Sequence, residues 1–193
     1  LITVAVGAAV DDGEWAGAGR YDVGEGGVDA IRFGFDTGNL YFRLDTAEGA
    51  VPAGFRLYLG APQLTRTRGA TLEGTVLGYG AGALVEWDPA APQTLCLTLG
   101  LPDVGREDRL GECEERPAGF DGSAIEFALP LDDIGPVEAG DRVLFTLVRS
   151  DRGGEGALFP GTGPALAVVP DISNVELFLE VDDPVGDDHG PGG

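Results

Sequence analysis

Residue types that could bind a metal or transfer protons are concentrated near the end of the sequence, in the stretch VDDPVGDDHGPGG (181–193). This stretch holds the only histidine, His189, and four aspartates. Such residues are typical of a metal site or of an acid–base site. Glycines and prolines surround His189, however, so no element there would hold its imidazole in register for a hydrolytic triad. We therefore expect no triad chemistry from this histidine.

Adjacent carboxylates recur along the chain. The pairs are Asp11-Asp12, Glu114-Glu115, Asp132-Asp133, Asp182-Asp183 and Asp187-Asp188. A glycoside hydrolase holds two carboxyl groups at a fixed separation across a cleft. Adjacent residues of a strand point to opposite faces, so adjacency alone does not predict such a pair. In a chain this acidic, the pairs are typical of solvated surface, and a hydrolase fragment stays an alternative.

Two acidic loops are candidates for a structural calcium ion. Calcium takes oxygen ligands from carboxylates and backbone carbonyls, often on loops. The loop VDDGEW (10–15) offers Asp11 and Asp12, and the loop that begins at residue 181 offers Asp182 and Asp183. The two loops meet if the terminal strands are neighbours. The alternative is that both are charged loops without a metal.

Sugar binding needs aromatic faces that stack on a pyranose ring. Trp87 in LVEWDP and Tyr79 in LGYGAG lie in a glycine-bent segment and are expected to face outward together, with Tyr41 as a further candidate. For each of these rings, a place in the core or at an edge is the alternative. We expect Trp15, which follows a turn, to fill the core.

The composition excludes some partners. The formal net charge is −21, and all twelve cationic residues are arginine. Nucleic acids and anionic membranes need a basic surface, so neither is expected as a partner. No apolar run approaches the roughly 20 residues of a membrane span.

The two cysteines, Cys96 and Cys113, lie 17 positions apart and form no CxxC motif. Structural zinc is therefore not expected. The spacing leaves open a disulfide that closes a hairpin and two free thiols.

Short alternating runs between turn residues predict an all-β fold. The segment 31–47 is typical of two strands joined by a turn at 36–39, and 71–89 of another pair with a glycine-rich bend. Further strands are predicted at 54–61, 93–100, 123–135, 141–151, 164–171 and 174–184, with a short helical turn within the third of these at PLDDIG (130–135). No helical period is sustained, so the pattern favours an antiparallel β-sandwich of the jelly-roll type.

Three stretches resemble a known family. These are DGEWAGAGRYDV with IRFGFDTGNLYFRLD (12–45), IEFALPLDDIGPVEAGDRVLFTLVRSD (125–151) and DPVGDDHGPG (183–192). The first two resemble DOMON-like β-sandwich modules related to family 9 carbohydrate-binding modules, which recur in amylolytic enzymes such as glycoside hydrolase family 57 proteins. The third resembles the opening of the C-terminal module of glucodextranase and its relatives.

This resemblance implies a β-sandwich at 1–181 and a junction to a further module at 182–193. It implies a non-catalytic, carbohydrate-binding or ancillary module of a secreted or cell-surface enzyme that acts on α-glucans. Its partners would be the polysaccharide and a catalytic domain of the same polypeptide. The alternative is a structural spacer that packs on the catalytic domain and never binds sugar.

Overall fold

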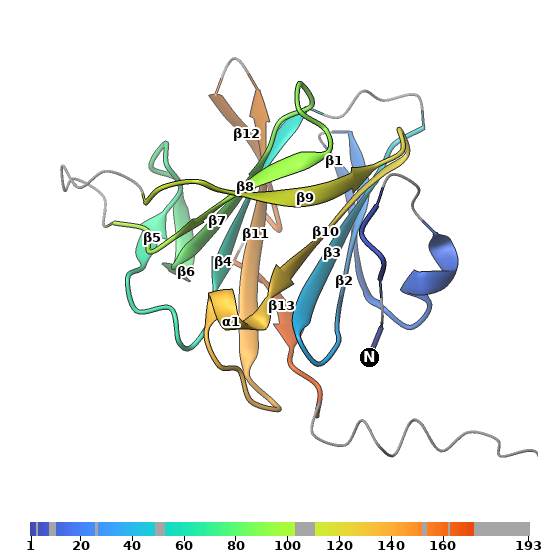
Figure 1. The fold of residues 1–193 in the computed structure, drawn as a ribbon. Coiled ribbons are helices and arrows are strands. Elements are labelled where there is room, and N and C mark those ends of the chain that lie inside the picture. The colour runs from blue at the N-terminus through green and yellow to red at the C-terminus, as the bar shows by residue number, and fades with distance from the viewer. Residues whose placement is uncertain are drawn as a thin grey trace, which may run out of the picture.

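The computed structural model describes residues 1–2, 4–7, 11–25, 27–48, 53–102, 111–151, 154–161 and 163–171. Nearly every element in these ranges is a β-strand (Figure 1). The strands are β1 (Gly19–Glu25), β2 (Val28–Phe35), β3 (Asn39–Thr46), β4 (Gly54–Gly60), β5 (Arg68–Ala70), β6 (Val76–Ala81), β7 (Ala83–Trp87), β8 (Thr94–Leu99), β9 (Glu114–Phe120), β10 (Ala124–Pro130), β11 (Arg142–Asp151), β12 (Gly154–Phe159) and β13 (Ala165–Val168). The helical elements are a 3-10 turn, η1 (Asp12–Trp15), and α1 (Leu131–Ile134).

Eleven of the described strands form one antiparallel sheet that curls into two layers. Its order is β1-β2-β3-β10-β9-β8-β7-β4-β11-β12, with β13 also paired to β11. Strand β9 links the layers, because residues 114–117 pair with β8 and residues 118–120 pair with β10. The all-β sandwich predicted from the alternating runs is confirmed.

The core lies between the layers and is built by period-2 alternation. Leu40, Phe42 and Leu44 of β3 point inward and are fully buried. They meet inward side chains of β4, β7, β10 and β11 in one hydrophobic cluster. The residues between them on each strand point out of the sandwich, so each layer has an outer face of its own.

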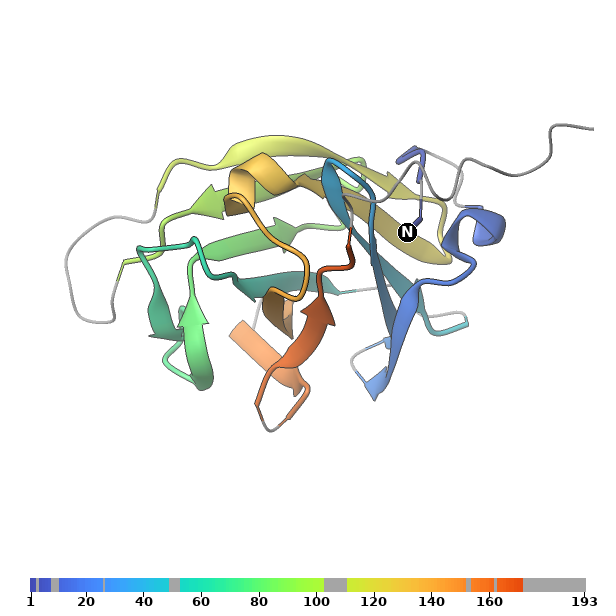
Figure 2. The ribbon, with the colours of Figure 1, turned by 90° about the horizontal axis from the view of Figure 1, so that it is seen from below.

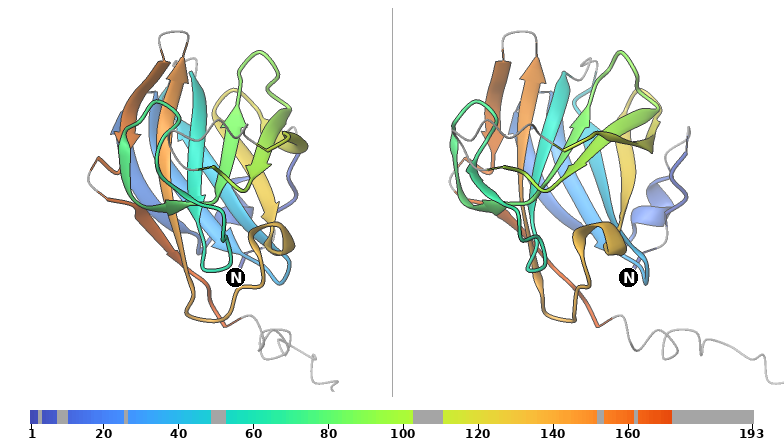
Figure 3. Two further views of the ribbon diagram at one scale, coloured as in Figure 1. Left: turned by 90° about the vertical axis from the view of Figure 1, so that its left-hand side faces the viewer. Right: turned by 60° about the vertical axis from the view of Figure 1, so that its left-hand side comes forward.

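The outer face of β4 and β11 is partly covered by the small β5–β6 sheet (Figure 3). Tyr58, Leu84 and Val148 of the main sheet pack there against Leu77 and other residues of the β5–β6 region. The expected strand pair within 71–89 is therefore wrong in its pairing. β6 pairs with β5, and β7 lies between β4 and β8, because the chain leaves one sheet for the other at Gly82.

The outer face of the other layer is covered by the N-terminal segment (residues 1–2, 4–7 and 11–18). This segment lies on the side of the molecule away from the β5–β6 sheet (Figure 2). Ile2, Val4 and Trp15 pack there against Tyr41 in a third apolar cluster. Trp15 is buried, but under this segment rather than between the layers.

Most of the other strands expected from the sequence are present in the structure. The 31–47 hairpin and the strands at 54–61, 93–100, 141–151 and 164–171 are confirmed. In the segment 123–135 the strand ends at Pro130, and the expected helical turn follows it. The expected strand at 174–184, the boundary at residue 181 and the junction 182–193 lie outside the described residues.

Candidate binding groove

An open groove crosses the outer face of β4, β7 and β8, next to the area that the β5–β6 sheet covers. Its volume is about 760 Å³. Its polar lining comes from nearby loops and from the side chains that point outward from these strands. The side chains at the positions between them point inward and fill the core. The charged and hydroxyl groups in the lining are Arg56, Glu86, Asp88, Thr94, Glu115 and Ser150.

The strand register places four groove residues in one row across the sheet. Arg56 of β4 lies opposite Glu86 of β7, which lies opposite Cys96 of β8. Cys96 in turn lies opposite Glu115 of β9. Cross-strand neighbours on one face are close enough for their side chains to interact. The row therefore joins a cation, two carboxylates and a sulfur along one line of the groove.

Arg56 is held on both sides by carboxylates. Its Nε donates to Glu86 Oε1 at 2.8 Å, and its Nη1 donates to Glu155 Oε1 at 3.1 Å. Tyr58 Oη donates to the same Glu155 oxygen at 2.6 Å. Burial alone would raise the pKa of Glu155, but hydrogen bonds from Thr71, Tyr58 and Arg56 outweigh it and lower the pKa. These partners favour the ionised form of Glu155, which reaches Arg56 from β12.

The structure contains the Cys96–Cys113 disulfide. Cys113 directly precedes β9, which returns antiparallel to β8, and the two Cα atoms lie 5.4 Å apart. Both cysteines line the groove. Of the two possibilities that the spacing left open, the bridged one is confirmed, and it joins the start of β9 to the centre of β8.

Trp87 borders the groove but offers no open ring face. Only 2% of its surface is exposed. Its ring stacks on Phe55 at 5.7 Å between centroids and meets the Phe120 ring edge-on. Its Nε1 donates to the Pro92 carbonyl at 3.1 Å. The indole therefore fills the core beside the groove and has no free face for stacking on a pyranose.

The other two predicted sugar-binding rings lie elsewhere. Tyr79 packs in the cluster under the β5–β6 sheet, and its Oη donates to the Tyr58 carbonyl at 2.8 Å. Tyr41 is buried under the N-terminal segment, where its Oη donates to Asp36 Oδ2 at 2.6 Å. Burial and this hydrogen bond raise the pKa of Tyr41 to about 12. The structure thus does not bring Trp87, Tyr79 and Tyr41 together.

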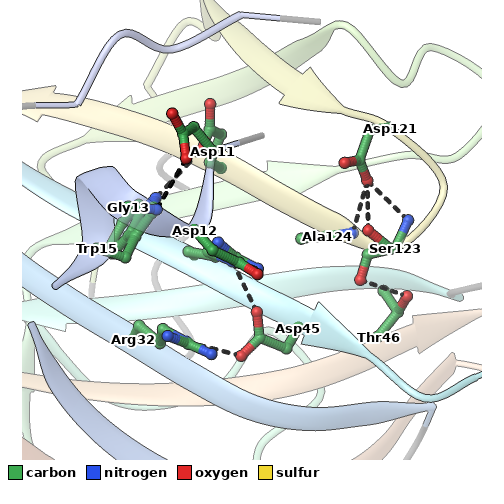
Figure 4. A network of polar contacts seen from close by, with 12 residues as sticks. Asp11, Asp12, Gly13, Trp15, Arg32, Asp45, Thr46, Asp121, Ser123 and Ala124 are labelled. Atoms are coloured by element: carbon green, nitrogen blue, oxygen red, sulfur yellow. Dashed lines mark hydrogen bonds and ion pairs between the residues drawn. The ribbon is translucent and has the colours of Figure 1, made fainter. Parts of the chain in front are cut away.

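The predicted calcium loop is engaged by protein groups (Figure 4). Asp11 accepts a hydrogen bond from the Gly13 N–H at 2.8 Å and so caps η1. Asp12 forms an ion pair with Arg43 at 2.6 Å. Among the residues that the structure describes, no three His, Cys, Asp or Glu side chains group as a metal site. Asp182 and Asp183 lie outside those residues.

Arg43 belongs to a second charged network, on the layer opposite the groove. Its Nε donates to Asp45 Oδ1 at 2.7 Å, and Arg32 Nε donates to the other oxygen of Asp45 at 2.8 Å. Beside Arg43, the fully buried Glu126 accepts from Trp15 Nε1 at 3.2 Å. Burial raises the pKa of Glu126. Glu126 and Glu155 lie on opposite outer faces, so these two buried carboxyls do not converge on one substrate.

Sequence reasoning missed Arg56, Glu86 and Glu155 as a group. The alternation in GFRLYLG (54–60) and ALVEW (83–87) does place Arg56 and Glu86 in the phase opposite to the core aromatics. That signal does not reveal that the two strands are neighbours in matching register. No local feature of the sequence marks Glu155, because it reaches Arg56 only when β11 of the β11–β12 hairpin pairs with β4.

Comparison of the chain with protein-family models, with curated proteins and with solved structures finds no match. Within the described residues, the helices are too short to cross a membrane.

Proposed function

We propose that this chain is a non-catalytic module that binds polysaccharide, or serves as an ancillary unit, in a secreted or cell-surface enzyme acting on α-glucans. The observation that carries the proposal is the open groove across β4, β7 and β8. It has the size of a small-ligand site and presents charged and hydroxyl groups of the kind that can hydrogen-bond to sugar hydroxyls. A catalytic domain of the same polypeptide is the proposed partner.

The disulfide supports the proposed location. Disulfides form and persist in oxidising compartments such as the cell exterior, and they are rare where thiols are kept reduced. The Cys96–Cys113 bridge therefore favours a secreted or surface-bound protein.

A structural spacer is the second candidate, and a specific observation favours it. Trp87 and Tyr41 are buried, and Tyr79 packs under the β5–β6 sheet, so these rings provide no exposed stacking platform. A spacer would keep the same sandwich and disulfide without binding sugar. The two candidates differ in whether the groove is ever occupied.

Affinity electrophoresis in gels with soluble starch, pullulan or dextran tests the proposal. We expect at least one glucan to retard the chain, and we expect Thr94→Trp to abolish retardation by placing an indole in the groove. Thr94 is an exposed groove residue on β8, so this change leaves the core intact. Thr75→Trp, at an exposed position of the β5–β6 turn outside the groove, is the matched control.

A wild-type chain that none of the three glucans retards would favour the spacer. A wild type that is retarded, with Thr94→Trp retarded to the same extent, would mean that glucan binds outside the groove and would refute the groove as the site. Thermal melting of each variant confirms that the fold is kept.

A further inference from the structure

The centre of the groove holds an ion pair that is only partly exposed to solvent. The side chain of Arg56 is 21% exposed, and that of Glu86 is 33% exposed. Their 2.8 Å contact uses Arg56 Nε and a single oxygen of Glu86. Both groups line the groove and so lie within reach of a ligand there.

The guanidinium keeps unused donors. A guanidinium carries five N–H groups in a planar fork. Within the described part of the chain, the hydrogen bonds of Arg56 use Nε and one N–H of Nη1. Three N–H groups are left, in fixed directions, and Glu86 has a second oxygen that can accept. The pair therefore presents parallel donors beside an acceptor.

Fixed parallel donors beside an acceptor match two adjacent hydroxyl groups. A hydroxyl both donates and accepts, so its oxygen can take an N–H from Arg56 while its proton goes to Glu86. Resting on the proposed function, we infer that Arg56 and Glu86 recognise the vicinal diol of an uncharged hexose unit in the bound glycan. The binding would then be polar recognition rather than ring stacking, which accounts for a sugar groove without an exposed aromatic platform.

The charge of the groove excludes acidic glycans. Arg56 is one cation among the carboxylates Glu86, Asp88 and Glu115 in the lining. Glu155 pairs with Arg56 from β12 and neutralises it further. In a chain with a net charge of −21, an anionic ligand would be repelled. The ligand class is therefore a neutral polyhydroxylated chain.

Glu155 and Tyr58 act as positioning residues. Glu155 is 4% exposed and reaches from β12 to Arg56 on β4. Tyr58 Oη fixes Glu155 and accepts a hydrogen bond from the Leu72 N–H at 2.9 Å. These contacts hold the guanidinium in place from the β12 side, so its remaining N–H groups keep one orientation without contact between Glu155 and the ligand.

The test measures affinity for dextran and for dextran whose vicinal diols have been cleaved with periodate and reduced with borohydride. Both polymers are neutral, but in the treated one the sugar rings are opened and the hydroxyl groups of each diol are no longer adjacent. We expect the cleaved polymer to bind at least about tenfold more weakly, because hydrogen bonds to a charged group are lost. We expect Arg56→Lys and Glu86→Gln to weaken binding of native dextran by a similar factor. Arg20→Lys, on the opposite layer, is the matched control and should bind like the wild type.

The preference between charged and neutral dextran distinguishes an effect of Glu155 on Arg56 from a loss of stability. Glu86→Gln and Glu155→Gln each remove a negative charge beside Arg56. We expect both to raise the affinity for carboxymethyl dextran relative to native dextran, a change that a loss of stability would not produce. Tyr58→Phe keeps the Glu155 charge and should weaken dextran binding without this switch.

The outcomes are distinct. A wild-type chain that binds no glucan would refute the proposed function and the inference together. Equal binding of native and cleaved dextran, or unchanged affinity in Arg56→Lys and Glu86→Gln, would overturn the inference and leave the groove as a glucan site. An unchanged preference in Glu155→Gln with normal melting would remove the positioning role.

Discussion

At the scale of single residues, the few arginines of this acidic chain neutralise carboxylates where a strand face is covered. Arg43 lies between Asp12 and Asp45 under the N-terminal segment, and Arg56 lies between Glu86 and Glu155 beside the β5–β6 sheet. A buried charge that loses its partner is costly. The two arginines thus explain why these faces tolerate several acids near one another.

Glu126 gives the stability of the fold a pH dependence of defined sign. Burial is the main cause that raises its pKa above the ordinary value of 4.5; Glu14 adds to this effect, and the hydrogen bond from Trp15 and the charge of Arg43 oppose it. A raised folded pKa means that the carboxyl contributes stability below its unfolded pKa and that this contribution is lost as pH rises through the folded pKa. We expect Glu126→Gln to remove this loss. The unfolding free energy of the wild type should then fall, relative to the variant, as the pH rises above about 4.5.

Urea denaturation at several pH values measures this difference. Glu138→Gln, an exposed position, is the control and should follow the wild type at each pH. A difference between wild type and Glu126→Gln that grows in favour of the wild type with rising pH would contradict the prediction.

At the scale of elements, the N-terminal segment depends on glycines in the sheet that it covers. A Cβ at Gly34 would meet the side chain of Ile2, and a Cβ at Gly119 would meet the backbone carbonyl of Gly7. Ile2 also donates its N–H to the Phe35 carbonyl at 2.9 Å. These close approaches fix the path of the segment across β2 and β9, and so the position of Trp15 over Glu126.

We expect Gly119→Ala to displace the N-terminal segment, because the added methyl group meets a backbone carbonyl that cannot rotate away. Overpacking of this kind costs typically 1–3 kcal/mol, so the free energy of unfolding should fall by about that amount. Limited proteolysis should also cleave the segment faster. Gly69→Ala has open space around its Cβ and is the control. Equal proteolysis and stability of the two variants would show that the segment does not depend on this contact.

At the scale of the whole molecule, a tyrosine joins the two ends of the curled sheet. Tyr21 of the edge strand β1 donates from Oη to the Leu166 carbonyl of β13 at 2.9 Å and accepts from the Leu166 N–H at 3.3 Å. Its ring packs against Phe33, Phe145 and Phe159. The phenol thus supplies the hydrogen bonds that a neighbouring strand would otherwise give to Leu166.

We expect Tyr21→Phe to weaken this closure while keeping the aromatic packing. Loss of the hydroxyl leaves two backbone groups of Leu166 without their partner, which costs about 1–3 kcal/mol of stability. Hydrogen exchange should be faster for residues 165–168 than in the wild type, with little change in β3 and β10. An unchanged exchange rate at Leu166 would mean that Tyr21 does not join the sheet edges.

Much of the strand pattern was predictable because it is local. Alternation and turn residues identify the β2–β3 hairpin, β4, β8, β10 and β11 without knowledge of their neighbours. β9 was missed because its sequence, EERPAGF, is polar and contains a proline. Its strand conformation is set by β8 and β10, which pair with its two halves.

The sequence by itself determined the all-β class, the phase of each alternating strand and the charge that disfavours anionic partners. Only the tertiary structure decided which faces stay open. Trp87 and Glu86 are neighbours on β7, yet the ring enters the core and the carboxylate enters the groove. The physical reason is that a strand face is buried or exposed according to what packs on it, and the β5–β6 sheet and the N-terminal segment reach those faces through contacts between residues distant in the sequence.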